Sequence, residues 1–90
     1  MDRPKLWQLN LEGFQANRES IIEWLSKADK SNWDDYTQAM MLAKLNMEAA
    51  YKCVMNIIDD SEAPDEIKEA VLGIYKMELL PEFRAKVDMG

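Results

Sequence analysis

The sequence predicts an all-α protein, an antiparallel three-helix bundle or hairpin with one long central helix. The chain has only three glycines and three prolines in 90 residues, and 48% of its residues are hydrophobic, a composition typical of a folded, helix-rich protein. Apolar residues recur every three or four positions along three stretches, and short polar connections separate these stretches. We expect one domain over residues 1–90, with an arm over 1–9 and a tail over 82–90.

The first helix is predicted from Leu11 to Ala28, because apolar side chains recur there at helical spacing. Gly13 weakens its first turn, since glycine costs roughly 1 kcal/mol relative to alanine inside a helix. We therefore expect a break or a short separate helix over residues 7–13.

The central helix is predicted from about Trp33 to Ile58, with Ser31 or Asn32 as its N-cap. Its apolar residues alternate at intervals of three and four, the pattern of a coiled-coil seam. The seam consists of Trp33, Tyr36, Met40, Ala43, Met47, Ala50, Val54 and Ile57, and the residues from Tyr36 onward are its predicted helical interface. A long partner helix is expected against it.

Other apolar residues, Met41, Leu42 and Leu45, lie off this seam on the back of the same helix. A helix that is apolar on most sides is normally buried on two sides. At 1.5 Å per residue this helix is about 39 Å long, more than a compact chain of this size needs. Either both faces are core of one bundle, or one face packs against a second copy or another protein.

The third helix is predicted from Pro64 to about Leu80, with proline at its first position. Pro81 is expected to end or kink it, because proline lacks an amide donor. Gly73 within it is taken to mark a close helix crossing. Its expected buried residues are Ile67, Ala70 or Val71, Ile74 and Met77.

The turn between the second and third helices carries the densest charge of the chain. Net charge is −6, and most of the excess of acids lies after residue 30. Such a field repels duplex nucleic acid and anionic membranes, and suits either solubility or a basic protein partner. The candidate partner-binding acids are Asp59, Asp60, Glu62, Asp65, Glu66 and Glu69. The segment lacks the glycine and the ligand spacing of an EF-hand, so no metal is predicted.

No catalytic constellation is evident. The chain has no histidine and no glycine-rich phosphate loop, so we expect no enzyme and no cofactor. Glu48 is expected to form i,i+4 ion pairs with Lys44 and Lys52. The single cysteine, Cys53, is read as a buried inert thiol, and it favours a reducing, cytoplasmic location.

A second candidate site combines aromatic rings with cations in the N-terminal third, the one part of the chain that is not acidic. Its residues are Trp7, Phe14, Arg18 and Lys27. They could bind a nucleotide-like anion between subunits, or the aromatic rings could be packing and the bases solvated.

Three functions follow as hypotheses. The first is a small acidic interaction protein, an inhibitor or adaptor that binds a larger basic protein, as phage-encoded inhibitors of nucleic-acid machinery do by charge and shape. The second is a homo-oligomer that binds a small anion. The third is a helical subunit of a larger assembly. No segment is long and apolar enough to suggest a signal peptide or a membrane span.

Overall fold

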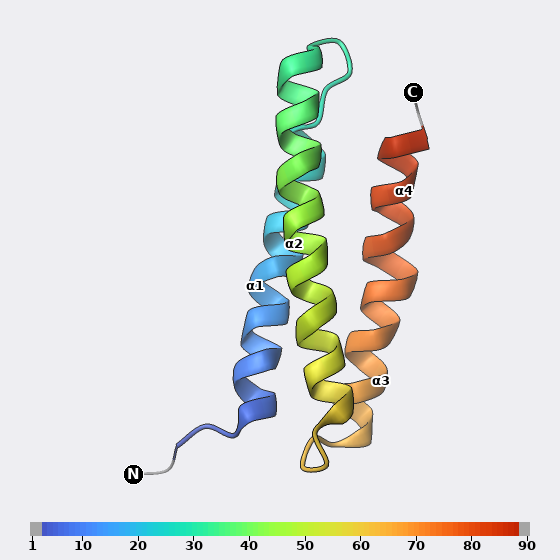
Figure 1. Ribbon diagram of the computed structural model, residues 1–90. Coiled ribbons are helices and arrows are strands. Elements are labelled where there is room, and N and C mark those ends of the chain that lie inside the picture. Colours follow the sequence, from blue (N-terminus) through green and yellow to red (C-terminus); the bar gives the residue numbers. More distant parts are fainter. Residues whose placement is uncertain (1–2, 89–90) are drawn as a thin grey trace.

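The computed structural model describes residues 3–88 and confirms an all-α bundle of three helical rods. The first two rods are α1 (Leu6–Lys27) and α2 (Trp33–Asp59), joined by a short turn into an antiparallel hairpin. The third rod contains α3 (Asp65–Ile74), a π-helical turn η1 (Tyr75–Leu79) and α4 (Leu80–Asp88). Figure 1 shows this rod running back up beside α2, which lies between its two neighbours in that view. The molecule is long and thin, with extents of 50 × 26 × 14 Å.

Helix α1 begins at Leu6, so the predicted break around Gly13 and the arm up to residue 9 are wrong. The amide of Lys5 donates to Gln8 Oε1 at 2.8 Å, which supports a helix start at this point. Farther along, the side chain of Asn17 donates to the carbonyl oxygen of Gly13 at 2.8 Å. The helix therefore runs without interruption through the glycine.

Gly13 marks a close approach between α1 and α2. A Cβ atom built at Gly13 would lie 3.2 Å from Cys53 Sγ, tighter than ordinary van der Waals contact, whereas nothing lies within 4 Å of a Cβ at Gly73. The prediction of a close crossing at Gly73 is therefore wrong. A small residue is required at position 13 of α1, because Cys53 of α2 fills the space that a larger side chain there would occupy.

The predicted seam of α2 is the core of the chain. Its six residues from Met40 to Ile57 are buried, and they pack with Phe14, Ile21 and Leu25 of α1 and with Val71 and Leu79 of the third rod. Tyr36 is half-buried, and its hydroxyl donates to the carbonyl oxygen of Lys86 at 3.0 Å. Trp33 is exposed and stacks on Tyr36, with 5.7 Å between ring centroids. From Met40 to Ile57 the seam therefore faces the protein's own helices, and its exposed part within the described chain is the end at Trp33.

The start of α2 follows the sequence prediction. Asn32 Oδ1 accepts from the amide of Asp35 at 3.3 Å, so Asn32 is the N-cap. Asp34 and Asp35 occupy the first turn, where carboxylates interact favourably with the positive end of the helix dipole.

The third rod does not end at Pro81. The amide of Leu80 donates to the carbonyl oxygen of Tyr75, five residues back, in a widened turn just ahead of the proline. A proline ring normally collides with the carbonyl group four residues earlier, here Met77, and the wider turn relieves that collision. The predicted tail over 82–90 is therefore helical as far as Asp88, and its last two residues lie outside the described part.

The π-helical turn also explains why Met77 is 82% exposed although a buried position was predicted. Val71 and Leu79 are buried and Tyr75 and Phe83 are half-buried, at intervals of four residues. In a regular α-helix such positions drift around the axis by about 40° per step, because each residue turns by about 100°. The extra residue of the wide turn brings Leu79 and Phe83 back to the inner face.

None of the helices over residues 3–88 combines the length and the apolar character that crossing a membrane requires.

We predict that Gly73→Ala stabilises the protein by about 1 kcal/mol, because alanine is the better helix former and nothing obstructs its Cβ. The midpoint of thermal unfolding should rise by about 4 °C or more. Gly13→Ala is the matched comparison, since its helix-propensity gain is offset by displacement of Cys53 Sγ. Equal stabilisation by both substitutions would contradict the close approach at Gly13.

Candidate interaction site

The acidic turn, defined as residues 59–69, lies at one end of the bundle where α2 passes into α3. The amide of Asp60 donates to the carbonyl oxygen of Ile57 at 3.2 Å, and Asp60 Oδ1 accepts from the amide of Glu62 at 2.9 Å. Ala63 is 5% exposed and anchors the turn in the core. The turn is therefore folded onto the bundle.

Within residues 3–88, the carboxylates of the acidic turn form no ion pairs. Asp60 is half-buried and the other five predicted acids are exposed. Over residues 3–88 the two ion pairs join Arg18 to Glu78 at 2.8 Å and Lys27 to Glu23 at 3.0 Å, both outside the turn. The charge of the turn is thus not neutralised within the described chain.

Beside the turn lies a hollow of about 580 Å³, where the start of α1 meets the end of α2. Asn56 Nδ2 donates to Asn10 Oδ1 at 3.1 Å and ties the two helices together there. Leu6 supplies an exposed apolar surface to the hollow. Its lining residues are Leu6, Asn10, Asn56, Asp59, Asp60 and Ser61.

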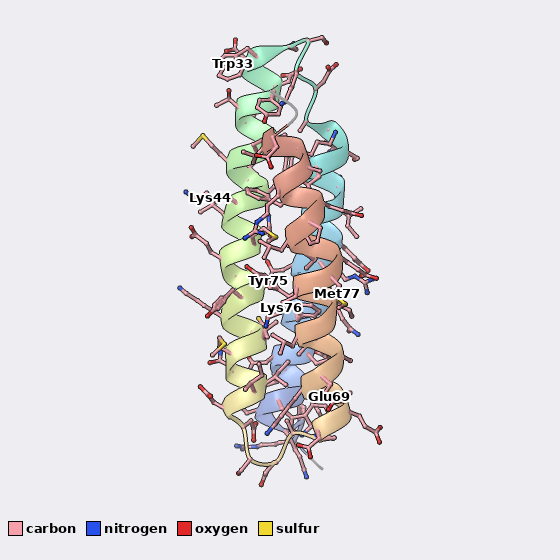
Figure 2. The ribbon with its side chains drawn as sticks, turned by 90° about the vertical axis from the view of Figure 1, so that its right-hand side faces the viewer. Trp33, Lys44, Glu69, Tyr75, Lys76 and Met77 are labelled. Atoms are coloured by element: carbon pink, nitrogen blue, oxygen red, sulfur yellow. The ribbon has the colours of Figure 1, made fainter. Side chains whose placement is uncertain are left out.

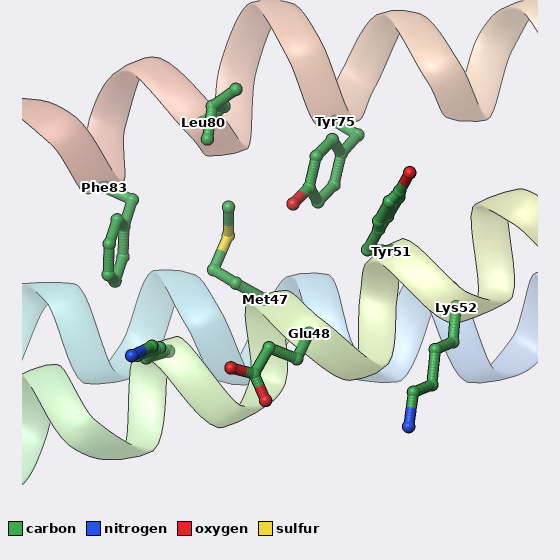
Figure 3. Close-up of a pocket in the computed structure, with 8 residues that line it drawn as sticks. Met47, Glu48, Tyr51, Lys52, Tyr75, Leu80 and Phe83 are labelled. Atoms are coloured by element: carbon green, nitrogen blue, oxygen red, sulfur yellow. The ribbon is translucent and has the colours of Figure 1, made fainter.

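A second cavity, which we call the groove, runs between α2 and the third rod and has a volume of about 430 Å³. Figure 3 shows Tyr75, Leu80 and Phe83 descending from the third rod toward Met47 and Tyr51 of α2. The rings of Tyr51 and Tyr75 lie 5.8 Å apart between centroids. Burial, and then the neighbouring Tyr51, raise the pKa of the Tyr75 phenol. The walls of the groove are therefore aromatic and apolar.

The groove was not predicted from the sequence, because the third helix was expected to end or kink at Pro81 and no widened turn was expected before it. The four-residue spacing of Val71, Tyr75, Leu79 and Phe83 is the signal that could have revealed it. That spacing indicates a local period longer than 3.6 residues, which a π-helical turn provides.

The N-terminal candidate residues do not converge on one site. Trp7 and Lys27 are separated by about 30 Å along α1, at 1.5 Å per residue. Phe14 is 1% exposed and belongs to the core. Arg18 is paired with Glu78, and Lys27 lies over the Trp24 ring, 4.9 Å from its centroid, as well as beside Glu23. The geometry thus favours packing and helix-surface pairing over a shared anion site.

The predicted ion pairs of Glu48 with Lys44 and Lys52 are absent from the described part of the chain. All three residues are exposed, and all three lie along the α2 side of the groove. In Figure 3 the side chains of Glu48 and Lys52 point away from the third rod. Glu48 and Lys52 therefore lie at the rim of the groove, with their charged groups on the outer face of α2.

Comparisons of the chain with protein-family models, with curated proteins and with solved structures find no match.

We predict low reactivity for Cys53, because burial raises the pKa of its thiol above the ordinary value of 9.0 and the thiolate is the nucleophile. Labelling by a disulfide reagent at pH 8 should be slower in the native protein than in urea. The folded state favours the neutral thiol, so this contribution to stability is present at neutral pH and is lost as the pH rises through 9 and beyond. Between pH 7 and 9.5, below the titration of the tyrosines, the unfolding free energy should fall more steeply with pH in the wild type than in Cys53→Ala. Equal labelling rates in the two states would contradict the prediction.

Proposed function

We propose that this protein is a small non-enzymatic interaction protein, an adaptor or inhibitor that holds a larger, basic protein through the acidic turn. The observation that carries the proposal is the set of six carboxylates on one end of the bundle, unpaired within the described chain. Because the carboxylates are not neutralised internally, their field extends into solvent and attracts positive surfaces.

The hollow beside the turn supports a basic partner in more detail. A lysine or arginine side chain has an aliphatic stem and a charged head. Leu6 offers apolar contact for the stem, while Asp59 and Asp60 offer carboxylates for the head. Asn10 and Asn56 add polar groups between them. A lysine or arginine of the partner would therefore place its aliphatic stem against Leu6 and its charged head beside Asp59 and Asp60.

Exposed apolar residues lead from the turn along α2. Met55 lies one helical turn before Asp59, and Tyr51 lies one turn before Met55. Met55 is 38% exposed and Tyr51 is 44% exposed. Protein interfaces combine such apolar contacts with a charged rim. The partner would thus contact the lower half of α2 and place its basic residues on the acidic turn. Basic surfaces of this kind are typical of proteins that bind nucleic acid, and an inhibitor would compete with nucleic acid there.

We predict that neutralising the turn weakens partner binding about tenfold or more, because charges on an interface rim govern association and salt dependence. The variant is Asp59→Asn, Glu62→Gln and Glu66→Gln in one chain. The matched control is Glu12→Gln, Glu19→Gln and Glu82→Gln, exposed acids elsewhere that change the net charge equally. Each full-length protein is immobilised, exposed to the soluble proteins of its source cells, and eluted with a salt gradient.

The expected result is a basic protein that elutes from the wild type and the control at higher salt than from the turn variant. Nuclear magnetic resonance with a tri-arginine peptide tests the hollow directly, with shifts expected at the amides of Leu6, Asn10, Asn56 and Ser61. A partner retained equally by all three proteins, or no basic partner at physiological salt, would contradict the proposal.

A further inference from the structure

The outer face of α2 carries a second seam, at intervals of four and three residues, opposite the buried one. We call it the outer seam; it consists of Asp34, Gln38, Met41, Leu45, Glu48 and Lys52. All six residues are exposed, and Met41 and Leu45 expose 63% and 60% of their surface. Figure 2 shows Trp33 and Lys44 on the edge of α2 that points away from the third rod. Neither residue is on the outer seam itself, whose six members are shown to be uncovered by their own exposure.

The outer seam is complementary to itself when its direction is reversed. Asp34 and Lys52 lie equally far from residue 43 along the helix, and they carry opposite charges. Gln38 and Glu48 are likewise symmetric, and an amide can donate to a carboxylate. Met41 and Leu45 form the apolar centre. A parallel arrangement would instead place each residue against its own copy, with acid facing acid and lysine facing lysine.

We propose that the outer seam binds a second copy of this chain, with the two α2 helices antiparallel about a two-fold axis at the height of residue 43. Each copy then places Asp34 against Lys52 of the other, Gln38 against Glu48, and Met41 against Leu45. A self-complementary patch of this kind is what a two-fold symmetric interface requires.

The surface of α2 has room for the central contact. A hollow of about 370 Å³ lies on this face, lined by Trp33, Asp34, Thr37, Gln38, Met41, Leu42 and Leu45. In the antiparallel arrangement, Leu45 of the second copy enters it between Gln38 and Met41. Insertion of a side chain between those of a facing helix is the usual contact in antiparallel and parallel coiled coils.

The elongated chain has ample surface for a dimer. Its accessible surface is 6315 Å², and a standard interface buries roughly 800 Å² of each partner. The outer seam ends at Lys52, before the acidic turn, so this inference goes beyond the proposed function and leaves the turn free, although Lys52 is the neighbour of Tyr51.

Charge reversal tests the arrangement, with the full chain studied by sedimentation velocity and by sedimentation equilibrium at low salt. The wild type should be a dimer. Asp34→Lys places lysine against lysine, and Lys52→Asp places aspartate against aspartate, so each single variant should raise the dimer dissociation constant about tenfold or more. Asp35→Lys is the matched control, with the same charge change in the same first turn but off the outer seam.

Two rescue experiments separate the proposed pairing from a general charge effect. The double variant Asp34→Lys, Lys52→Asp should recover the wild-type dissociation constant. An equimolar mixture of the two single variants should form a heterodimer, because the lysine introduced at position 34 of one chain would then face the aspartate introduced at position 52 of the other. The native Lys52 and Asp34 that remain in the two chains would face each other as in the wild type. Leu45→Glu should give a monomer whose helical circular dichroism and thermal unfolding are retained, since this residue is exposed.

A wild type that remains monomeric at about 100 μM would overturn the proposal and assign the outer seam to a different protein or to solvent. A dimer that is equally stable in Asp34→Lys and Asp35→Lys, or single variants that do not associate on mixing, would also overturn it. Failure of the acidic-turn experiment would leave these results unchanged, because the turn variants retain the outer seam.

Discussion

The close contact between α1 and α2 at Gly13 is the constraint on which the rest of the bundle depends. Cys53 Sγ occupies the space that a larger side chain at Gly13 would need, and the buried alanines of α2 keep the hairpin thin along its length. A thin hairpin has little interior of its own, so its apolar residues must also be covered by the third rod. The flat shape of the molecule, 14 Å in its shortest extent, reflects this arrangement.

The third rod covers the hairpin unevenly, and this unevenness produces the surfaces available for binding. Val71 and Leu79 are buried, whereas Tyr75 and Phe83 remain half-buried and line the groove. The opposite side of α2 receives no cover from either neighbour. Ion pairs are also unevenly distributed. Within residues 3–88 they join residues of α1 and η1, and none involves the acids of the α2–α3 turn. Packing and charge therefore divide α2 into an inner face, an outer face and an acidic end.

Much of this fold can be predicted from sequence because its signals are local. The seam of α2 and the Asn32 cap follow from periodicity and from side-chain chemistry within a few residues. The start of α1 depends on a hydrogen bond from the amide of Lys5 to the side chain of Gln8. Gly13, farther along the same helix, indicated a break instead. Whether the seam faced its own chain or a partner depended on tertiary contacts with Phe14 and Leu79, which no local pattern specifies. The groove was not predicted because the third helix was expected to end or kink at Pro81, which left the π-helical turn unforeseen.

The wide turn over Tyr75–Leu79 lets the third rod carry one residue more than a regular α-helix of the same phase. Each residue of an α-helix turns it by about 100°, so after removal of the exposed Met77 a regular α-helix would place Leu79 and Phe83 three and seven positions after Tyr75, still on the inner face. Phe83 would keep its place in the groove, and the carbonyl oxygen of Lys86 would stay beside Tyr36. The cost would fall on Pro81, whose ring would again meet a carbonyl group four residues back, whereas a deletion elsewhere in the rod would rotate everything after it.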